Sequence, residues 1–218
     1  MIACLHMQMK LKKKSSNFWL PILSGIFIGT SYIPFPPWAI LFAYVPLWIW
    51  WSQQERWSKV WWGGWLTQFT LNLIGFNWVT YTIHEFGHLN WFISVLGFLL
   101  YCGFSSLHIP LAGLLWFFLK RHLKPNSKLE ITLLPATAIL CELLYPMIFT
   151  WHLGYTLLWQ GWPIFNLAEF VGFQGLSSLI FIFNALIFLI AVTAQQKSKI
   201  VTGFRFLGIF FIFLSFFF

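Results

Sequence analysis

The spacing of the basic residues constrains the fold of this chain more than any other feature. Its 13 Lys and Arg residues fall only in every second gap between long apolar stretches. The four basic groups are Lys10–Lys14, Arg56–Lys59, Lys120–Lys128 and Lys197–Arg205. The other gaps, at residues 33–37, 82–90 and 150–163, contain neither Lys nor Arg. Because basic loops remain on the cytoplasmic side of a membrane, this alternation predicts a multi-pass protein with a cytoplasmic N-terminus.

Composition indicates the same class of protein. Hydrophobic residues make up 59% of the chain and charged residues 8%, with a mean hydropathy of +0.76. An ordinary soluble domain has about 25% charged residues, so a water-soluble fold is excluded. The net charge of +8 comes from short clusters beside apolar stretches, so we expect the membrane surface as a partner and no nucleic acid. The three cysteines, Cys4, Cys102 and Cys141, predict no disulfide framework.

Seven apolar stretches are candidates for membrane-spanning helices, each of which needs roughly 20 residues. They cover residues 18–33, 37–52, 60–82, 91–119, 129–149, 164–194 and 200–218. Prolines in the 33–37 gap separate the first two as a tight hairpin, and Pro110 predicts a kink in the fourth. Most of the 15 Trp residues lie near the ends of these stretches, where aromatic belts form. The predicted fold is therefore all-α, a polytopic bundle of about seven transmembrane helices over residues 18–218, behind a basic cytoplasmic segment at 1–17.

The five acidic residues are all Glu, and they differ in their surroundings. Glu55 and Glu130 lie beside basic residues and are interpreted as solvated surface charges. Glu169 lies near the outer end of its apolar stretch, and its role stays open. Glu142 lies inside an apolar stretch, where an ionised carboxylate costs at least ~2.5 kcal/mol. We therefore expect Glu142 to face a polar interior and to belong to a functional or hydrogen-bonded network.

The segment His84-Glu85-Phe86-Gly87-His88 matches the H-E-x-x-H pattern of zinc metalloproteases. In that pattern two His residues one helical turn apart hold the metal, and the Glu activates its water. The chain contains no Asp to complete such a site from another membrane segment, and Gly87 weakens the helix. An intramembrane zinc protease is therefore the less favoured alternative, and we expect no metal and no cofactor.

A further motif begins at Phe149-Thr150-Trp151-His152-Leu153-Gly154-Tyr155 and continues through Pro163, Gly172, Gly175 and Asn184. Together with the earlier positions Gly25, Pro34, Trp38, Asn77-Trp78, Phe86-Gly87 and Glu142, it resembles the membrane domain of apolipoprotein N-acyltransferases over about residues 20 to 195. The resemblance implies a substrate-facing or positioning role for Asn77, Trp78, Phe86, Gly87, Glu142, Trp151, Gly154 and Tyr155. It departs from the family at Thr150, at Thr156 and in lacking an Arg shortly after Glu142.

The resemblance also implies a function and a location. The family transfers an acyl group from a phospholipid to the N-terminal amine of a diacylated lipoprotein, at the bacterial inner membrane, during lipoprotein biosynthesis. Its Glu-Lys-Cys triad belongs to a nitrilase-like domain that would follow the last apolar stretch, in which the sequence ends at Phe218. No residue here is assigned a catalytic role, and Cys141 beside Glu142 is interpreted as structural. We therefore expect a truncated acyltransferase that is inactive alone. The alternative is a lipid-binding scaffold that partners a separately encoded nitrilase-like subunit.

Overall fold

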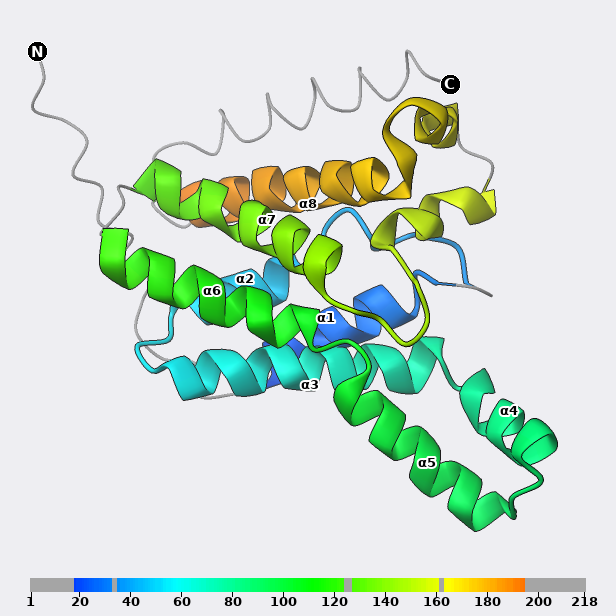
Figure 1. The fold of residues 1–218 in the computed structure, drawn as a ribbon. Helices are drawn as coiled ribbons and strands as arrows, with labels where there is room; N and C mark the ends of the chain where they lie inside the picture. The colour runs from blue at the N-terminus through cyan, green and yellow to red at the C-terminus, as the bar shows by residue number, and fades with distance from the viewer. Residues whose placement is uncertain (1–17, 33–34, 124–126, 161–162, 195–218) are drawn as a thin grey trace, which may run out of the picture.

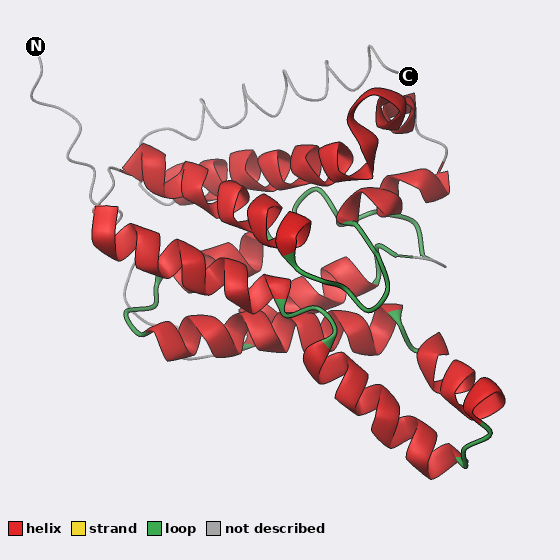
Figure 2. Ribbon diagram, in the orientation of Figure 1, coloured by secondary structure: helices red, strands yellow, loops and turns green. Residues whose placement is uncertain are grey.

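The computed structural model describes residues 18–32, 35–123, 127–160 and 163–194 of the chain. These residues form helices and loops without a strand, which confirms the predicted all-α class (Figure 2). The α-helices are α1 (Trp19–Gly29), α2 (Val45–Ser52), α3 (Trp57–Gly75), α4 (Trp78–Gly87), α5 (Trp91–Phe104), α6 (His108–Leu123), α7 (Ser127–Leu144) and α8 (Ala168–Ala194). Two 3-10 helices, η1 (Leu153–Gln160) and η2 (Pro163–Leu167), precede α8.

Several predicted spans are divided differently in the structure. The 60–82 stretch is split between α3 and α4, and the 91–119 stretch between α5 and α6. Helix continues through the predicted outer gap as far as Gly87, at the end of α4. The predicted interruption of the fourth stretch lies just before Pro110: the chain turns at residues 105–107, and Pro110, in the first turn of α6, has no N–H to donate to the Ser106 carbonyl. The 1–17 and 200–218 segments lie outside the described residues.

Two stretches of the described chain are long and apolar enough to cross a membrane. They are Trp91–Leu123, which comprises α5, α6 and the turn between them, and Ala168–Val192 in α8. The interpretation as a bundle of about seven spans stays a prediction.

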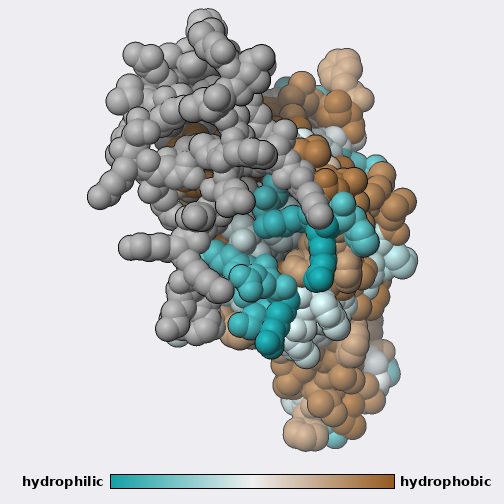
Figure 3. All heavy atoms as spheres, turned by 90° about the vertical axis from the view of Figure 1, so that its left-hand side faces the viewer, coloured by the Kyte–Doolittle hydropathy of each residue, from teal (hydrophilic) through white to brown (hydrophobic). Residues whose placement is uncertain are grey.

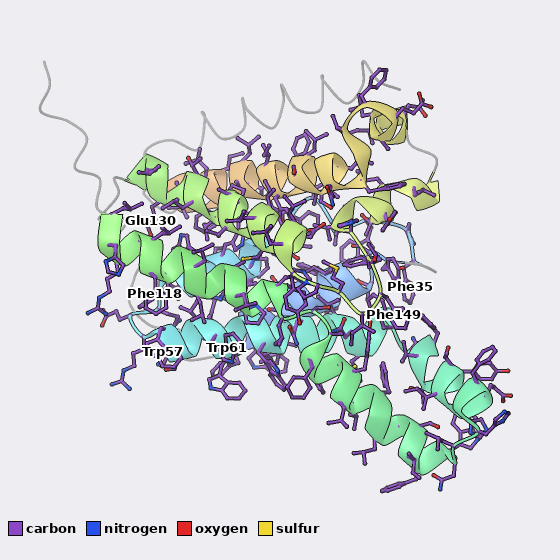
Figure 4. The ribbon with its side chains drawn as sticks, viewed as in Figure 1. Phe35, Trp57, Trp61, Phe118, Glu130 and Phe149 are labelled. Carbon is purple, nitrogen blue, oxygen red and sulfur yellow. The ribbon has the colours of Figure 1, made fainter. Side chains whose placement is uncertain are left out.

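The helices pack in an unbroken series, with α1 on α3, α3 on α6, α6 on α7 and α7 on α8. Helices α4 and α5 pack on each other and form an arm that projects from this bundle (Figure 1). The start of α3, the end of α6 and the start of α7 meet at one end of the bundle, which carries Arg56, Lys59, Lys120 and Arg121 and is called the basic end below. Figure 3 faces this end and shows hydrophilic side chains gathered there beside a hydrophobic surface. Trp57 and Glu130 lie at the basic end, and Phe35 and Phe149 lie at the opposite end (Figure 4).

Glu130 does not lie free in solvent as its sequence neighbours suggested. Its side chain is 12% exposed and forms an ion pair with Lys120 across the α6–α7 contact. The Lys120 ammonium also lies 4.8 Å from the centroid of the Trp116 ring. The interpretation of Glu130 as a solvated charge is therefore wrong, because α6 and α7 bring the two charges together at the basic end.

Three Trp residues predicted to lie in an interfacial belt are buried in the core instead. Trp48, Trp50 and Trp51 on α2 are each at most 1% exposed. Glycines on the facing helices leave room for two of the rings, since a Cβ added at Gly63 would lie 2.3 Å from Trp50 and one at Gly113 would lie 2.5 Å from Trp51. These indoles therefore fill space between close-packed helices. Trp57 and Trp62 are more than half exposed near the basic end, as an aromatic belt requires.

Polar side chains on α3 form hydrogen bonds with residues at the break between α5 and α6. The Gln68 amide donates to the Gly103 carbonyl at 2.8 Å, and the Asn72 amide donates to the Ser105 hydroxyl at 2.8 Å. Ser106 in turn donates to the Asn72 oxygen at 3.2 Å. A broken helix leaves backbone carbonyls without helical partners, which is costly in an apolar environment. The side-chain amides on α3 supply the missing hydrogen-bond partners and thereby stabilise the turn.

Asn184 plays the same role for the non-helical segment before α2. Its side-chain oxygen accepts from the Tyr44 amide at 2.8 Å, and its nitrogen donates to the Ile40 carbonyl at 2.9 Å. The side chain is fully buried on α8. This single residue therefore connects the segment at 39–44 to α8.

We expect Asn184→Leu to lower the stability of the purified protein by about 2 kcal/mol, because two buried backbone groups lose their partners. Thermal unfolding in detergent measures the change. The matched control is Asn77→Leu, which removes an exposed amide that donates to the nearby Ile74 carbonyl. Equal melting temperatures for the two variants would contradict the role given to Asn184.

Candidate functional site

The site is built around the carboxylate of Glu142, near the end of α7. Its Oε1 atom accepts from the Ser177 hydroxyl at 2.6 Å and from the Leu153 amide at 3.2 Å. The His152 Nδ1 atom lies 3.3 Å from the same oxygen, so a hydrogen on Nδ1 completes the contact. The Ser177 hydroxyl also accepts from the Gly154 amide at 2.8 Å. These residues, Glu142, His152, Leu153, Gly154 and Ser177, are called the carboxylate node below.

Local chain geometry explains why the node forms here. Helix η1 begins at Leu153, and the first amides of a helix have no partners within it. The carboxylate of Glu142 accepts from the first of them, and Ser177 on α8 accepts from the next. Such a position also favours negative charge. Glu142 is 5% exposed and is surrounded by hydrogen-bond donors. Its position inside an apolar stretch predicts such a polar environment.

Close approach between η1 and α8 depends on Gly154. A Cβ added there would lie 2.3 Å from the Phe173 carbonyl oxygen and 2.8 Å from the Leu176 Cβ. The next residue, Tyr155, packs its ring on Phe173 with centroids 4.2 Å apart. Gly154 and Tyr155 therefore seat η1 against α8 and bring its amides to Glu142 and Ser177.

A cavity of about 260 Å³ lies beside the node, between α7 and α8. Helix α8 bends at Gly172, whose φ of +67° suits glycine. The cavity has an apolar side and a polar side, and its lining consists of Ile139, Glu142, Leu143, Val171, Gln174, Gly175, Ser177 and Ser178. The arrangement can hold a small group that donates hydrogen bonds to a carboxylate.

Trp151 lies in an aromatic cluster next to the node. Its ring is 8% exposed and makes edge contacts with Tyr32 and Phe76, with centroids 5.0 Å and 5.9 Å apart. Trp78 extends the cluster outward, because it packs on Phe76 and on Phe149 and is 45% exposed. The cluster joins the loop before η1 to the ends of α1, α3 and α4.

The predicted site residues do not all converge. Glu142 and Gly154 meet in the node, Tyr155 adjoins it, and Trp151 and Trp78 share the aromatic cluster. Asn77 is exposed and donates to the Ile74 carbonyl of its own region. Phe86, which is 80% exposed, and Gly87 lie on the arm at the end of α4, apart from the node (Figure 1). The structure therefore does not bring Phe86 and Gly87 to the carboxylate.

The H-E-x-x-H segment lies on the same arm. Helix α4 includes His84 and Glu85 but ends at Gly87, and His88 is left-handed at φ 50°. His84 Nδ1 lies 2.6 Å from the Leu89 carbonyl, and its ring stacks on Trp91. The two His residues thus do not follow each other on one regular helical face. In the described part of the chain no group of three or more His, Cys, Asp or Glu side chains is placed to hold a metal.

Three members of the node were absent from the predicted site, and one of them, Leu153, contributes only its backbone amide. Ser177 was missed although it belongs to a polar group in the 164–194 stretch, together with Gln174 and Ser178. His152 was missed although it precedes the family-like Gly154-Tyr155 pair. Polar residues in an apolar helix usually face other protein groups, and this signal could have found Ser177.

The fold and the node define an all-helical domain with two stretches of membrane-spanning length and a buried carboxylate held at one end. The family model described as the apolipoprotein N-acyltransferase N-terminal domain matches residues 24–186. The apolipoprotein N-acyltransferase of Bdellovibrio bacteriovorus is 47% identical over 175 residues, which are 80% of this chain and 32% of the relative. That of Coxiella burnetii is 28% identical over 196 residues, covering 84% of this chain and 38% of the relative.

The chain therefore belongs to the apolipoprotein N-acyltransferase family, through the N-terminal domain of that family. This confirms the resemblance carried by the motifs around Trp151 and Glu142. The chain spans about a third of the length of the curated relatives it matches.

Proposed function

We propose that this chain provides the membrane domain of a lipoprotein N-acyltransferase, in which a polytopic bundle of about seven helices sits in the bacterial inner membrane. The match of the family's N-terminal domain over residues 24–186 carries this proposal. In it, the domain holds the phospholipid and the diacylated lipoprotein at the outer face of the membrane. The carboxylate node and the neighbouring aromatic cluster position these substrates, with Glu142, Trp151, Gly154, Tyr155 and Trp78 as the main residues. Asn77 adjoins Trp78, and Phe86 and Gly87 contribute from the arm, apart from the node.

The orientation of the bundle follows from its charges. Arg56, Lys59, Lys120 and Arg121 belong to the basic end, which the positive-inside rule assigns to the cytoplasm. Helix α7 begins at that end with Ser127, and Glu142 lies 15 residues further on. At 1.5 Å per residue this is about 22 Å, so the node lies near the outer boundary of a core about 30 Å thick.

Single cysteines test this orientation in a background in which Cys4, Cys102 and Cys141 are replaced by Ser. The introduced thiols are Trp57→Cys at the basic end and Phe149→Cys at the opposite end, where the native side chains are 55% and 43% exposed. We expect a membrane-impermeant maleimide to label the thiol at 149 in intact spheroplasts and the thiol at 57 only after lysis. External labelling at 57 would overturn the proposed topology.

In the family, the chemical step belongs to a different domain. The resemblance places it on a Glu-Lys-Cys triad of a nitrilase-like domain, in which the Cys forms a thioacyl intermediate. In the described residues Cys141 adjoins Glu142 on α7, but neighbours along a helix point in different directions. Lys59 and Lys120 lie at the basic end of the bundle. We therefore propose that these 218 residues position substrates and do not catalyse transfer.

Purified protein containing only these 218 residues should not acylate a diacylated lipoprotein peptide supplied with phospholipid. Mass spectrometry of the peptide measures the transfer, with the Bdellovibrio bacteriovorus relative as the active reference. Transfer by the 218-residue chain that is lost on Cys141→Ser would contradict the positioning role and make Cys141 a nucleophile.

A further inference from the structure

Helix α3 carries a row of aromatic side chains on one side. Trp62, Trp65 and Phe69 follow one another at helical spacing, with ring centroids 5.5 Å and 5.1 Å apart, and are called the aromatic row below. Trp62 is 54% exposed, and Leu73, which continues the row, is 43% exposed. The Trp65 indole donates to the Gly103 carbonyl at 3.0 Å, which fixes its ring. Helices α1, α5 and α6 also pack on α3, but the exposed side chains of the row leave this side open to the surroundings.

Two basic side chains lie at the start of the aromatic row. Arg56, the residue before α3, and Lys59 in its first turn are both exposed. In the described part of the chain neither of them forms an ion pair, whereas Lys120 at the same end of the bundle does. The carboxylate of Glu55 precedes them, so two cations beside one acid leave a net charge of +1. The aromatic row therefore begins beside an excess of positive charge.

The dimensions of the row match one leaflet of a membrane. The distance along α3 from Lys59 to Phe69 is about 15 Å at 1.5 Å per residue, which is half of a hydrocarbon core ~30 Å thick. With the basic end in the cytoplasm, the two cations lie among the headgroups of the inner leaflet, and the aromatic row lies along the acyl chains. A zwitterionic headgroup carries its own cation, so the excess positive charge attracts an anionic headgroup more strongly.

We propose that this side of α3 binds an anionic diacyl phospholipid of the cytoplasmic leaflet, with the lipid phosphate on Arg56 and Lys59 and one acyl chain along the aromatic row. The surface begins at the basic end, whereas the carboxylate node lies near the opposite boundary of the membrane. The bound lipid is therefore a partner of the fold and not a substrate held at the node. The inference rests on the proposed placement in the membrane but not on acyl transfer.

Photochemical labelling of the purified 218-residue chain tests this surface in vesicles of phosphatidylcholine. The probes are phosphatidylglycerol and phosphatidylcholine that carry the same diazirine on one acyl chain, and mass spectrometry of peptides measures the label on residues 60–73. We expect the anionic probe to label this segment about fivefold more than the zwitterionic probe, because the two cations attract only the former's net charge. Equal labelling by the two probes would overturn the proposal.

Charge variants separate this surface from the general attraction of a basic protein for anionic lipid. Lys59→Gln should lower the labelling ratio to about twofold, and Arg56→Gln combined with Lys59→Gln should lower it to about one. The matched control is Arg121→Gln, which removes the same charge as Lys59→Gln from an exposed position on α6 and should keep the ratio. A ratio that survives the double substitution, or that falls equally in Lys59→Gln and Arg121→Gln, would overturn the proposal.

Two further variants keep the test independent of folding defects. Glu55→Gln removes the one acid beside the two cations and should raise the ratio above that of the native chain, an increase that misfolding does not produce. Trp62→Ser shortens the aromatic row at an exposed position and should lower labelling of the segment by both probes. An unchanged ratio in Glu55→Gln, or unchanged labelling in Trp62→Ser, would contradict the proposed binding mode.

This proposal and the proposed function fail separately. Selective labelling of α3 in a chain whose fusion to the relative's catalytic part transfers no acyl group would contradict the proposed function alone. Equal labelling by the two probes in a chain that supports acyl transfer would contradict the lipid site alone.

Discussion

Replacing Gly154 by Ala should destabilise the protein by about 3 kcal/mol, which corresponds to roughly 10 °C in melting temperature for a chain of this size. The added Cβ would lie 2.3 Å from the Phe173 carbonyl oxygen and 3.0 Å from the Ser177 amide nitrogen. Both atoms belong to the backbone of α8, so they cannot rotate away as a side chain would. Helix η1 must therefore shift, and the Gly154 and Leu153 amides lose their partners in the node.

Gly103→Ala is the matched control for this variant. Gly103 is also a buried glycine, but a Cβ there would meet its nearest neighbour, Trp65, at 3.9 Å, an ordinary contact distance. It should leave the melting temperature nearly unchanged, because Ala is also the better helix former. If Gly154→Ala and Gly103→Ala unfold at the same temperature, η1 is not seated on α8 as described.

Replacing Glu142 by Leu should have an effect of similar size, about 3 kcal/mol, because it leaves several buried donors without an acceptor. These donors are the Ser177 hydroxyl, the Leu153 amide and the His152 ring. Leu fills the space of the carboxylate without leaving a cavity, so most of the loss reports hydrogen bonding. Thermal unfolding measures stability, and hydrogen exchange at η1 shows whether the loss is local.

Two further substitutions calibrate the Glu142 result. Glu142→Gln keeps an acceptor oxygen and should lose less than half as much stability as Glu142→Leu. Glu169→Leu removes an exposed carboxylate from the start of α8 and should have little effect. The node is not a stabilising element if Glu142→Leu and Glu169→Leu behave alike.

The general class of the fold and part of the site could be predicted from local sequence. Apolar stretches longer than about 18 residues admit little besides helix in a membrane, and the structure is all-helical. Glu142 could be singled out because a carboxylate in such a stretch needs partners. The Gly154-Tyr155 pair was recognised by resemblance, and its close approach to α8 gives a physical reason for a glycine there.

The features that could not be predicted depend on partners far apart in the chain. Pro110 favours a break near residue 106, but the polar partners that support it, Gln68 and Asn72 on α3, lie more than 30 residues away in the sequence. Burial of Trp50 and Trp51 depends on Gly63 and Gly113, which lie on other helices. Ser177 reaches Glu142 across a separation of 35 residues. Periodicity and local propensity contain no information on such pairings.

We propose that this chain is the membrane domain of a lipoprotein N-acyltransferase. The most direct measurement is acyl transfer by a fusion in which the 175 matching residues of this chain replace their counterparts in the Bdellovibrio bacteriovorus relative. Mass spectrometry of a diacylated lipoprotein peptide reports the product, and membrane insertion of the fusion is checked separately. We predict transfer of the same order as that of the intact relative. An inserted, folded fusion that transfers no acyl group would contradict the account.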